Sequence, residues 1–267
     1  AQATLVAPQP KPNLQVGLLQ APAVWRVGDT VQVSYTVTNA GNDPLVAFVT
    51  DRLQLVNSAN PAEVFTLSPS PAKTRTLGIG ESYVQTGSFI VPAAGSGSWL
   101  LRVSADVSGA VSESNEGDNT AELGVAVVHP DARVRELAVQ GLQQGGEALQ
   151  LTWITDNIGS ADAAQVKDTV YLSRDGALQL GTDIKLGEFS HSLIQAGGSS
   201  AAALSVMLPV DAVGIYRLLV VTDLANTLNE NPGGEDNNLA TADLDVAQDF
   251  YADLVVTGVE SPVRIID

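Results

Sequence analysis

The chain contains no cysteine among its 267 residues, which excludes a disulfide framework and thiol chemistry. No apolar run approaches the ~18 residues that a membrane-spanning helix needs, so we expect no membrane insertion. Basic residues are also few: 13 Lys and Arg stand against 30 Asp and Glu, which gives a net charge of -17. Such a polyanionic surface repels phosphate backbones, so nucleic acid is not an expected partner.

An acidic segment that occurs twice organises the chain. The first copy, residues 106–119, reads DVSGAVSESNEGDN, and the second, residues 223–238, reads DLANTLNENPGGEDNN. Each copy follows an alternating apolar stretch and precedes a shorter one. Equivalent positions lie 117 or 119 residues apart, because the second copy is longer. A repeat at this spacing predicts two domains of the same fold in tandem.

The other segments of the chain repeat in the same order. Gly28-Asp29 precedes one alternating stretch, and Gly146-Glu147 precedes its counterpart 118 residues later. Residues 253–256 then repeat residues 13–16 at a spacing of 240. We therefore predict an extended lead-in over 1–12, a first domain over 13–128, a second over 129–247, and a linker with the first strand of a truncated third repeat over 248–267. Because the connectors are short, the domains should lie end to end.

A period of two residues predicts strands in both copies. In residues 30–39, apolar and polar side chains alternate, which is typical of a strand with one buried face. No stretch shows a sustained helical stripe with caps. Short strands separated by Gly, Pro, Asn and Asp turns predict an all-β fold of tandem immunoglobulin-like β-sandwiches. Residues 69–76 lack a period and are expected to form a loop, and Trp25 is expected in a loop that packs over one end of the sandwich.

The order of short motifs in each copy is specific enough to compare with a family. The second copy carries Asn157 and Gly159 in a turn, then Leu172-Ser173-Arg174-Asp175, Leu186-Gly187, Gly214-Ile215-Tyr216, and a terminal Asp223, Glu230, Glu235, Asn237 and Asn238. This pattern resembles the CARDB family of cell-adhesion-related, immunoglobulin-like domains in bacterial and archaeal surface proteins. The first copy departs in its middle, where Leu55-Val56-Asn57-Ser58 replaces Leu-Ser-x-Asp. The resemblance implies a fold and an extracellular location, but no single ligand.

The two acidic segments are candidate cation sites. Ca²⁺ prefers carboxylate and amide carbonyl oxygens as ligands. The residues that would converge on it are Asp106, Glu113, Glu116, Asp118 and Asn119 in the first copy, and Asp223, Glu230, Glu235, Asp236 and Asn238 in the second. However, no Asp-x-Asp-x-Asp-Gly loop is present. We favour the alternative that the Glu and Asn side chains hydrogen-bond backbone amides and hold an irregular loop in one shape.

The sequence offers no catalytic motif. His129 falls in a linker and His191 in a Ser-rich turn, without a Gly-x-Ser-x-Gly elbow or a His-Glu-x-x-His helix. We therefore predict that the chain is not an enzyme and that Ca²⁺ is its only candidate cofactor. We expect a spacer or adhesion module of a secreted or cell-surface protein, with other protein domains or further copies of itself as partners. One alternative is a calcium- or carbohydrate-binding accessory module of a secreted hydrolase.

The apolar end of the chain suggests a second alternative. An apolar strand that remains alone in water gains nothing to offset the entropy lost on ordering it. Pairing with the strand edge of a neighbouring molecule would be strand addition, and a head-to-tail contact of this kind would build an extracellular filament. The residues of this possible assembly strand are Asp253, Leu254, Val255, Val256, Val259, Val263 and Ile265. The competing interpretation is that they begin a further domain of a longer array.

Overall fold

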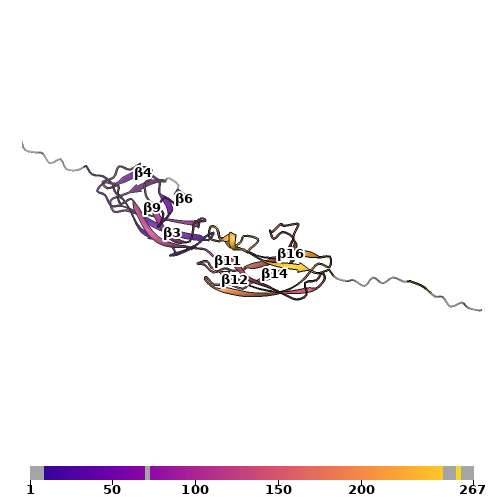
Figure 1. The fold of residues 1–267 in the computed structure, drawn as a ribbon. Coiled ribbons are helices and arrows are strands. Elements are labelled where there is room, and N and C mark those ends of the chain that lie inside the picture. Colours follow the sequence, from indigo (N-terminus) through magenta and orange to yellow (C-terminus); the bar gives the residue numbers. More distant parts are fainter. Residues whose placement is uncertain (1–8, 70–72, 249–256, 260–267) are drawn as a thin grey trace, which may run out of the picture.

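The structure is a computed structural model that describes residues 9–69, 73–248 and 257–259. Strands dominate it, and they form two successive β-sandwiches (Figure 1). The prediction of an all-β fold with tandem sandwiches is therefore confirmed. None of the helices in the described residues is long and apolar enough to cross a membrane.

Domain 1 is a sandwich of two sheets with an additional two-stranded sheet. Its sheets have the strand orders β1-β3-β8 and β2-β10-β9-β5-β6, and β4 pairs with β7. The strands are β1 (Leu14–Gln20), β2 (Val24–Arg26), β3 (Thr30–Asn39), β4 (Leu45–Val49), β5 (Arg52–Asn57), β6 (Val64–Pro69), β7 (Lys73–Leu77), β8 (Ser82–Ile90), β9 (Gly97–Ser104) and β10 (Thr120–Val128).

Domain 2 repeats this plan with fewer strands. Its sheets have the orders β11-β12-β15 and β14-β13-β16-β17. The elements are β11 (Ala132–Gln140), β12 (Ala148–Asn157), β13 (Lys167–Ser173), β14 (Ile184–Ser190), β15 (Ser199–Met207), β16 (Gly214–Thr222), the 3-10 helix η1 (Gly234–Asn237) and β17 (Leu239–Val246).

The alternating faces of the strands form the two cores. In domain 1, Tyr35 of β3 and Trp99 of β9 are buried between the sheets, and Trp153 of β12 has the same role in domain 2. Each fully buried side chain of this kind contributes about 1.5–3 kcal/mol relative to an exposed one. The apolar positions of the period-two pattern are therefore those whose side chains face the core.

Two local expectations were wrong. Residues 73–77 form strand β7 rather than a loop, because their backbone pairs with β4 although only Leu77 among them is buried. Trp25 lies in strand β2, which pairs in parallel with β10, and not in a loop. Its ring is completely buried, as the packing interpretation required, and its Nε1 donates to Pro22 O at 2.8 Å.

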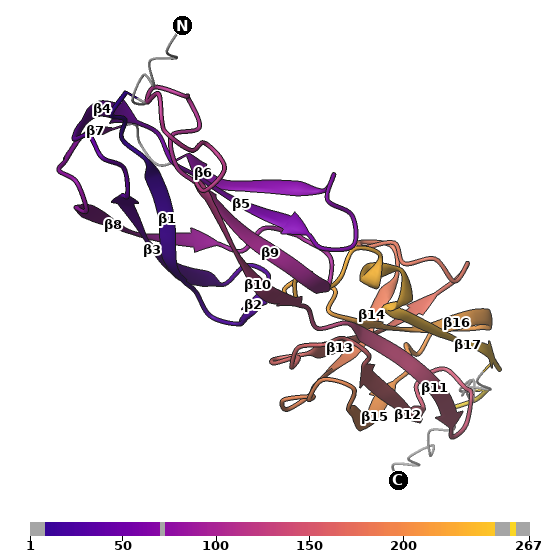
Figure 2. The same ribbon diagram turned by 90° about the vertical axis from the view of Figure 1, so that its left-hand side faces the viewer.

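The two domains lie end to end (Figures 1 and 2). We call residues 106–119 loop 1 and residues 223–238 loop 2. Loop 2, which contains η1, lies where the domains meet, whereas loop 1 lies at the opposite end of domain 1 (Figure 2). The equivalent loops therefore have different neighbours.

Candidate functional site

Loop 1 is held by hydrogen bonds from backbone amides to its carboxylates. Asp106 has a left-handed backbone (φ 45°), and its side chain accepts hydrogen bonds from Ala110 N at 3.0 Å and Val111 N at 2.8 Å. Glu113 accepts a hydrogen bond from Leu14 N, the first amide of β1. Loop 1 thereby fixes both its own shape and the start of the first strand.

Loop 2 repeats this arrangement at the equivalent positions. Asp223 (φ 42°) accepts from Thr227 N and Leu228 N, each at 2.9 Å to its Oδ2. Glu230 accepts from Ala132 N, the first amide of β11, at 2.7 Å. The recurrence of both contacts explains why Asp and Glu repeat at a spacing of 117.

The asparagines that end the loops contact carboxylates rather than backbone amides. Asn119 Nδ2 donates to Glu113 Oε1 at 2.9 Å, and Asn238 Nδ2 donates to Glu235 Oε2 at 3.0 Å. Their Oδ1 atoms are buried and have no hydrogen-bond partner in the described structure. Each asparagine therefore donates to glutamate carboxylates that repel one another. Its own carbonyl oxygen accepts no hydrogen bond in the described structure.

The carboxylates of each loop repel one another. Burial raises the pKa of Glu113, and Glu116 and Asp106 raise it further. In loop 2, burial together with Glu235 and Asp131 raises the pKa of Glu230 to about 7. Removal of a proton from Glu230 thus costs more than it would in water, as expected for crowded carboxylates.

The remaining predicted metal residues are more peripheral. Asp118 Oδ2 accepts from Asn13 Nδ2 at 3.0 Å, and Asp236 lies exposed in η1. Within the described residues, no group of three or more His, Cys, Asp or Glu side chains is arranged to hold a metal ion. The hydrogen bonds described above define the shape of both loops.

Each domain also buries an aspartate that the sequence analysis did not single out. Asp51 follows β4 and accepts hydrogen bonds from the hydroxyls of Tyr35 and Tyr83, each at 2.9 Å. Asp168 in β13 lies 117 residues later and accepts from Trp153 Nε1 at 2.6 Å. The sequence signal that could have revealed this pair is an acidic residue next to an apolar stretch that recurs at the repeat spacing of 117.

In domain 2, the buried aspartate belongs to a Ser-His-Asp chain. His191 Nε2 lies 2.6 Å from Asp168 Oδ2, and His191 Nδ1 lies 2.9 Å from Ser200 Oγ. His191 was expected in a turn, but its side chain is completely buried. In form, this arrangement of three side chains resembles the catalytic triad of a serine hydrolase.

Comparison with domain 1 assigns the Ser-His-Asp chain a structural role. Ser200 is equivalent to Tyr83, whose hydroxyl reaches Asp51 directly. In domain 2 the side chain of Ser200 is too short to reach Asp168, and the imidazole of His191 lies between them and contacts both. The donor that Tyr83 supplies to the buried carboxylate in domain 1 is thus replaced in domain 2 by His191, which Ser200 contacts in turn.

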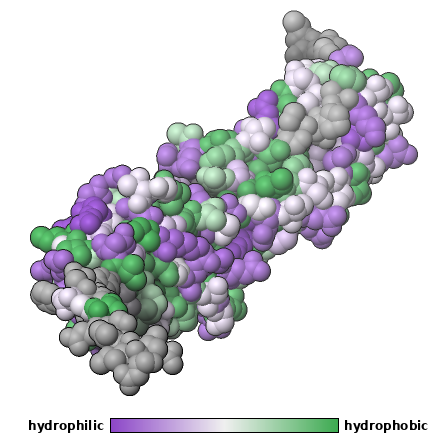
Figure 3. Space-filling view, turned by 90° about the vertical axis from the view of Figure 1, so that its right-hand side faces the viewer, coloured by the Kyte–Doolittle hydropathy of each residue, from purple (hydrophilic) through white to green (hydrophobic). Residues whose placement is uncertain are grey.

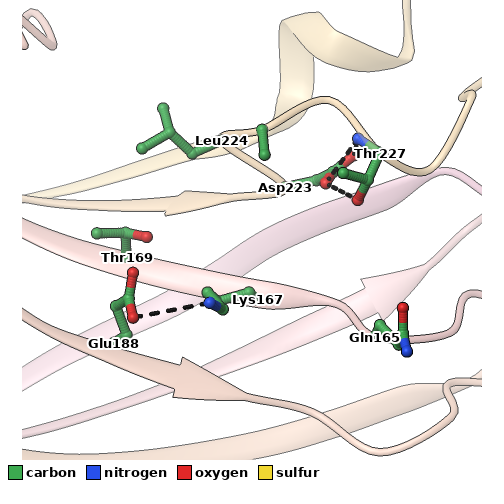
Figure 4. A pocket seen from close by; sticks show the side chains of 8 residues that line it. Gln165, Lys167, Thr169, Glu188, Asp223, Leu224 and Thr227 are labelled. Carbon is green, nitrogen blue, oxygen red and sulfur yellow. Dashed lines mark hydrogen bonds and ion pairs between the residues drawn. The ribbon is translucent and has the colours of Figure 1, made fainter.

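A pocket in domain 2 has a mixed lining. It has a volume of ≈ 570 Å³ and lies beside Asp223, at the start of loop 2 (Figure 4). Lys167 and Glu188 face each other across 3.8 Å in its wall, so their charges compensate (Figure 4). Elsewhere, the face drawn in Figure 3 intersperses apolar with polar residues. Neither surface specifies a ligand.

The contact between the domains is the other notable site, which we call the joint. Domain 1 contributes the backbone of Ala94 and Ser96 together with the hydroxyl of Ser96, and domain 2 contributes His129, Ser160, Asn229 and Asn231. Asn231 Oδ1 accepts from Ser96 N at 3.0 Å, and His129 contacts both Ala94 O and Asn229 O. Loop 2 therefore forms part of the joint as well as part of domain 2.

The chain is similar to several solved structures. The CARDB domain of the PF1109 protein from Pyrococcus furiosus, in a crystal structure in complex with di-metal ions, is 23% identical, covers 44% of this chain and 90% of its own, and has a TM-score of 0.35. A solution structure of that domain is 24% identical, with coverages of 45% and 97% and a TM-score of 0.33. Red sea bream transglutaminase is 14% identical, with coverages of 90% and 32% and a TM-score of 0.31.

No curated protein matches the chain. The CARDB family model, in contrast, matches it twice, over residues 11–123 and 129–242. These segments follow the two sandwiches and together span most of the sequence. The chain therefore belongs to the CARDB family and carries two of its domains in tandem.

Proposed function

We propose that the chain is a non-catalytic spacer in a bacterial or archaeal cell-surface protein and holds neighbouring domains apart. The observation that supports this proposal is the end-to-end arrangement, in which a short linker and loop 2 connect the two domains. The surplus of negative charge suits a segment that stays soluble and separate from other surfaces. A spacer needs no ligand pocket, which is consistent with the mixed lining of the pocket beside Asp223.

Small-angle X-ray scattering and binding assays test this proposal. We expect the 267-residue chain to scatter as an elongated particle in which the two domains keep one separation. We also expect no saturable binding to immobilised glycans or extracellular matrix proteins. Saturable binding would favour an adhesion module instead, and a distribution of domain separations as broad as that of freely linked domains would contradict the spacer.

The filament and the hydrolase accessory role rest on different grounds. The assembly strand of a filament lies outside the described residues, except Val259, which is 86% exposed and in no strand. A role beside a secreted hydrolase concerns domains other than these two. Light scattering of the full chain against a chain that ends at Val246 tests the filament, which requires that only the full chain assembles.

Cation binding by loop 2 is a second candidate function. Its support is the pair of buried, unpartnered carbonyl oxygens of Asn237 and Asn238 beside Glu230 and Glu235. Amide carbonyl and carboxylate oxygens are the ligands that Ca²⁺ takes. Loop 1 is less suited, because Lys11 Nζ already lies 3.4 Å from Glu113 O.

Scanning calorimetry with Ca²⁺ and with a chelator tests this candidate. A ligand that binds only the folded state stabilises it by about 2.7 kcal/mol at a hundredfold excess over its Kd. We expect Ca²⁺ to raise the melting temperature of domain 2, and we expect Asn238→Ala to abolish the effect while its loop 1 counterpart Asn119→Ala preserves it. Equal melting temperatures with Ca²⁺ and chelator would leave the loops a purely structural role.

A further inference from the structure

His129 is buried at the joint, with only 1% of its surface exposed. Its backbone is fixed to domain 2, because its carbonyl oxygen accepts hydrogen bonds from Ser160 N and Ala161 N at 2.8 Å each. Its ring reaches both domains. Nδ1 lies 3.0 Å from the carbonyl oxygen of Asn229 in loop 2, and Nε2 contacts the carbonyl oxygen of Ala94 in domain 1.

The two partners of the ring have the same hydrogen-bonding character. A backbone carbonyl oxygen can only accept, whereas a neutral imidazole has one donor nitrogen and one acceptor nitrogen. A neutral His129 therefore donates to one carbonyl and directs a lone pair at the other. An imidazolium donates to both. In a site shut off from water, an acceptor without a donor is costly, so the contact across the joint depends on the second proton.

Domain 1 shows what occupies the equivalent position when no domain precedes it in the described structure. Lys11-Pro12-Asn13 corresponds to His129-Pro130-Asp131, and Lys11 Nζ lies 3.4 Å from Glu113 O and 2.9 Å from Ser112 Oγ. A permanent cation thus donates to a carbonyl oxygen of loop 1, one residue beyond the position equivalent to Asn229. Lys11 is only half-buried, whereas His129 is buried.

The segments that form the joint also carry titratable groups of their own. The segments of domain 2 that surround His129 carry carboxylates, and the Ala94 segment of domain 1, residues 92–96, carries no titratable group. The turn at Gly28 in domain 1 carries one basic residue and one acidic residue. No described ion pair involves the imidazole. The titratable groups of these segments are Asp131, Asp162, Glu230, Glu235 and Asp236 in domain 2, and Arg26 and Asp29 in domain 1.

We propose that His129 makes the joint sensitive to pH. As an imidazolium it links Asn229 O to Ala94 O and docks the two domains, and as a neutral ring it releases one of these carbonyls and loosens the joint. Histidine is the side chain that most often changes its charge between about pH 5 and pH 8, so this range is the one to test. The inference concerns the joint itself and stands whether or not the chain acts as a spacer.

Distance measurements between spin labels test the proposal. The chain has no cysteine, so Ser88→Cys in β8 and Ala203→Cys in β15, both exposed, give one label in each domain. At pH 5.5 we expect one narrow distance distribution, and at pH 8 an added broad component. A tenfold change in the ratio of docked to undocked molecules, equivalent to about 1.4 kcal/mol, is the expected size.

Three comparisons decide the outcome. His129→Phe should give the broad distribution at both pH values, with an unchanged circular dichroism spectrum as evidence of folding. Glu230→Gln should keep the pH response, which separates the histidine from the glutamate that titrates in the same range. Nitrogen chemical shifts should show both ring nitrogens of His129 protonated at pH 5.5, and only His191 shares that spectral region. A response that is absent, or that persists in His129→Phe, overturns the proposal.

Discussion

The buried aspartates show how one residue position can carry opposite pH effects in the two domains. Burial alone would raise the pKa of Asp168, but hydrogen bonds from His191, Thr155 and Trp153 outweigh it and lower that pKa. At Asp51, burial outweighs the hydrogen bonds from Tyr35 and Tyr83, and the pKa is raised. Three donors to one carboxylate oxygen, rather than depth of burial, make the difference.

The lowered pKa of Asp168 predicts an acid-sensitive domain 2. An aspartate with a depressed folded pKa stabilises the fold above its unfolded pKa of about 3.9, and this contribution is lost as the pH falls through the folded pKa. We expect Asp168→Asn to cost about 1–3 kcal/mol at pH 7, because a buried charged acceptor is replaced, and to flatten the loss of stability in acid. Urea unfolding at pH 7 and pH 3 measures both. The exposed Asp243→Asn is the control and should change neither.

The raised pKa of Asp51 predicts the opposite dependence of stability on pH for domain 1. Because its folded pKa is raised, protonation favours the folded state, so its contribution to stability grows as the pH falls toward the unfolded pKa. Asp51→Asn keeps an oxygen that accepts from the two tyrosines and removes the buried charge. We expect a change of less than about 1 kcal/mol at pH 7. A cost as large as that of Asp168→Asn, measured in the same urea series, would contradict this assignment.

At the scale of elements, the Asn-x-Gly turns predict a steric requirement. A Cβ at Gly159 would lie 2.4 Å from His129 O, and one at Gly41 would lie 2.5 Å from Lys11 O, so each glycine lets the chain pass at backbone distance. We expect Gly159→Ala to destabilise domain 2 by about 1–3 kcal/mol through the forced shift. Gly124→Ala in β10, where nothing lies within 4 Å, is the matched control for space. Equal thermal unfolding of the two variants would show that the linker adjusts freely.

Much of the element order could be read from the sequence, because burial of one strand face imposes a period of two. β3 is the clearest case, with Val31, Val33 and Val37 all buried. The strand β7 could not be read in this way, since most of its side chains are not buried and it is defined by backbone pairing with β4. In the loops, composition revealed the acidic repeat, but hydrogen bonds across about 100 residues, such as Glu230 to Ala132, have no local signal.

At the scale of the whole molecule, the joint is what gives two sandwiches one shape. Few polar contacts form it, and they come from loops that the sequence marks only as acidic and asparagine-rich. His129 was predicted to lie in a linker, and its position there is correct, but its burial depends on a second domain. Contacts of this type depend on how two folded surfaces meet, and therefore no periodicity within either domain encodes them.

Asn231 provides a test of the joint that does not depend on protonation. Its Oδ1 is the acceptor for Ser96 N across the joint, so Asn231→Ala removes one interdomain hydrogen bond and leaves each core intact. We expect a broader distribution of domain separations at every pH, measured by small-angle scattering or by spin-label distances. We expect the free energy of unfolding of each domain to stay within about 0.5 kcal/mol of that of the parent protein. The equivalent change in loop 1, Ser114→Ala, faces no domain in the described structure and should leave the separations unchanged. If Asn231→Ala keeps the narrow distribution, the linker and the remaining contacts of the joint, those of His129 and the one between the hydroxyls of Ser96 and Ser160, set the orientation. If both variants broaden it, the loops act through the stability of their own domains, and the joint is not the structural unit described here.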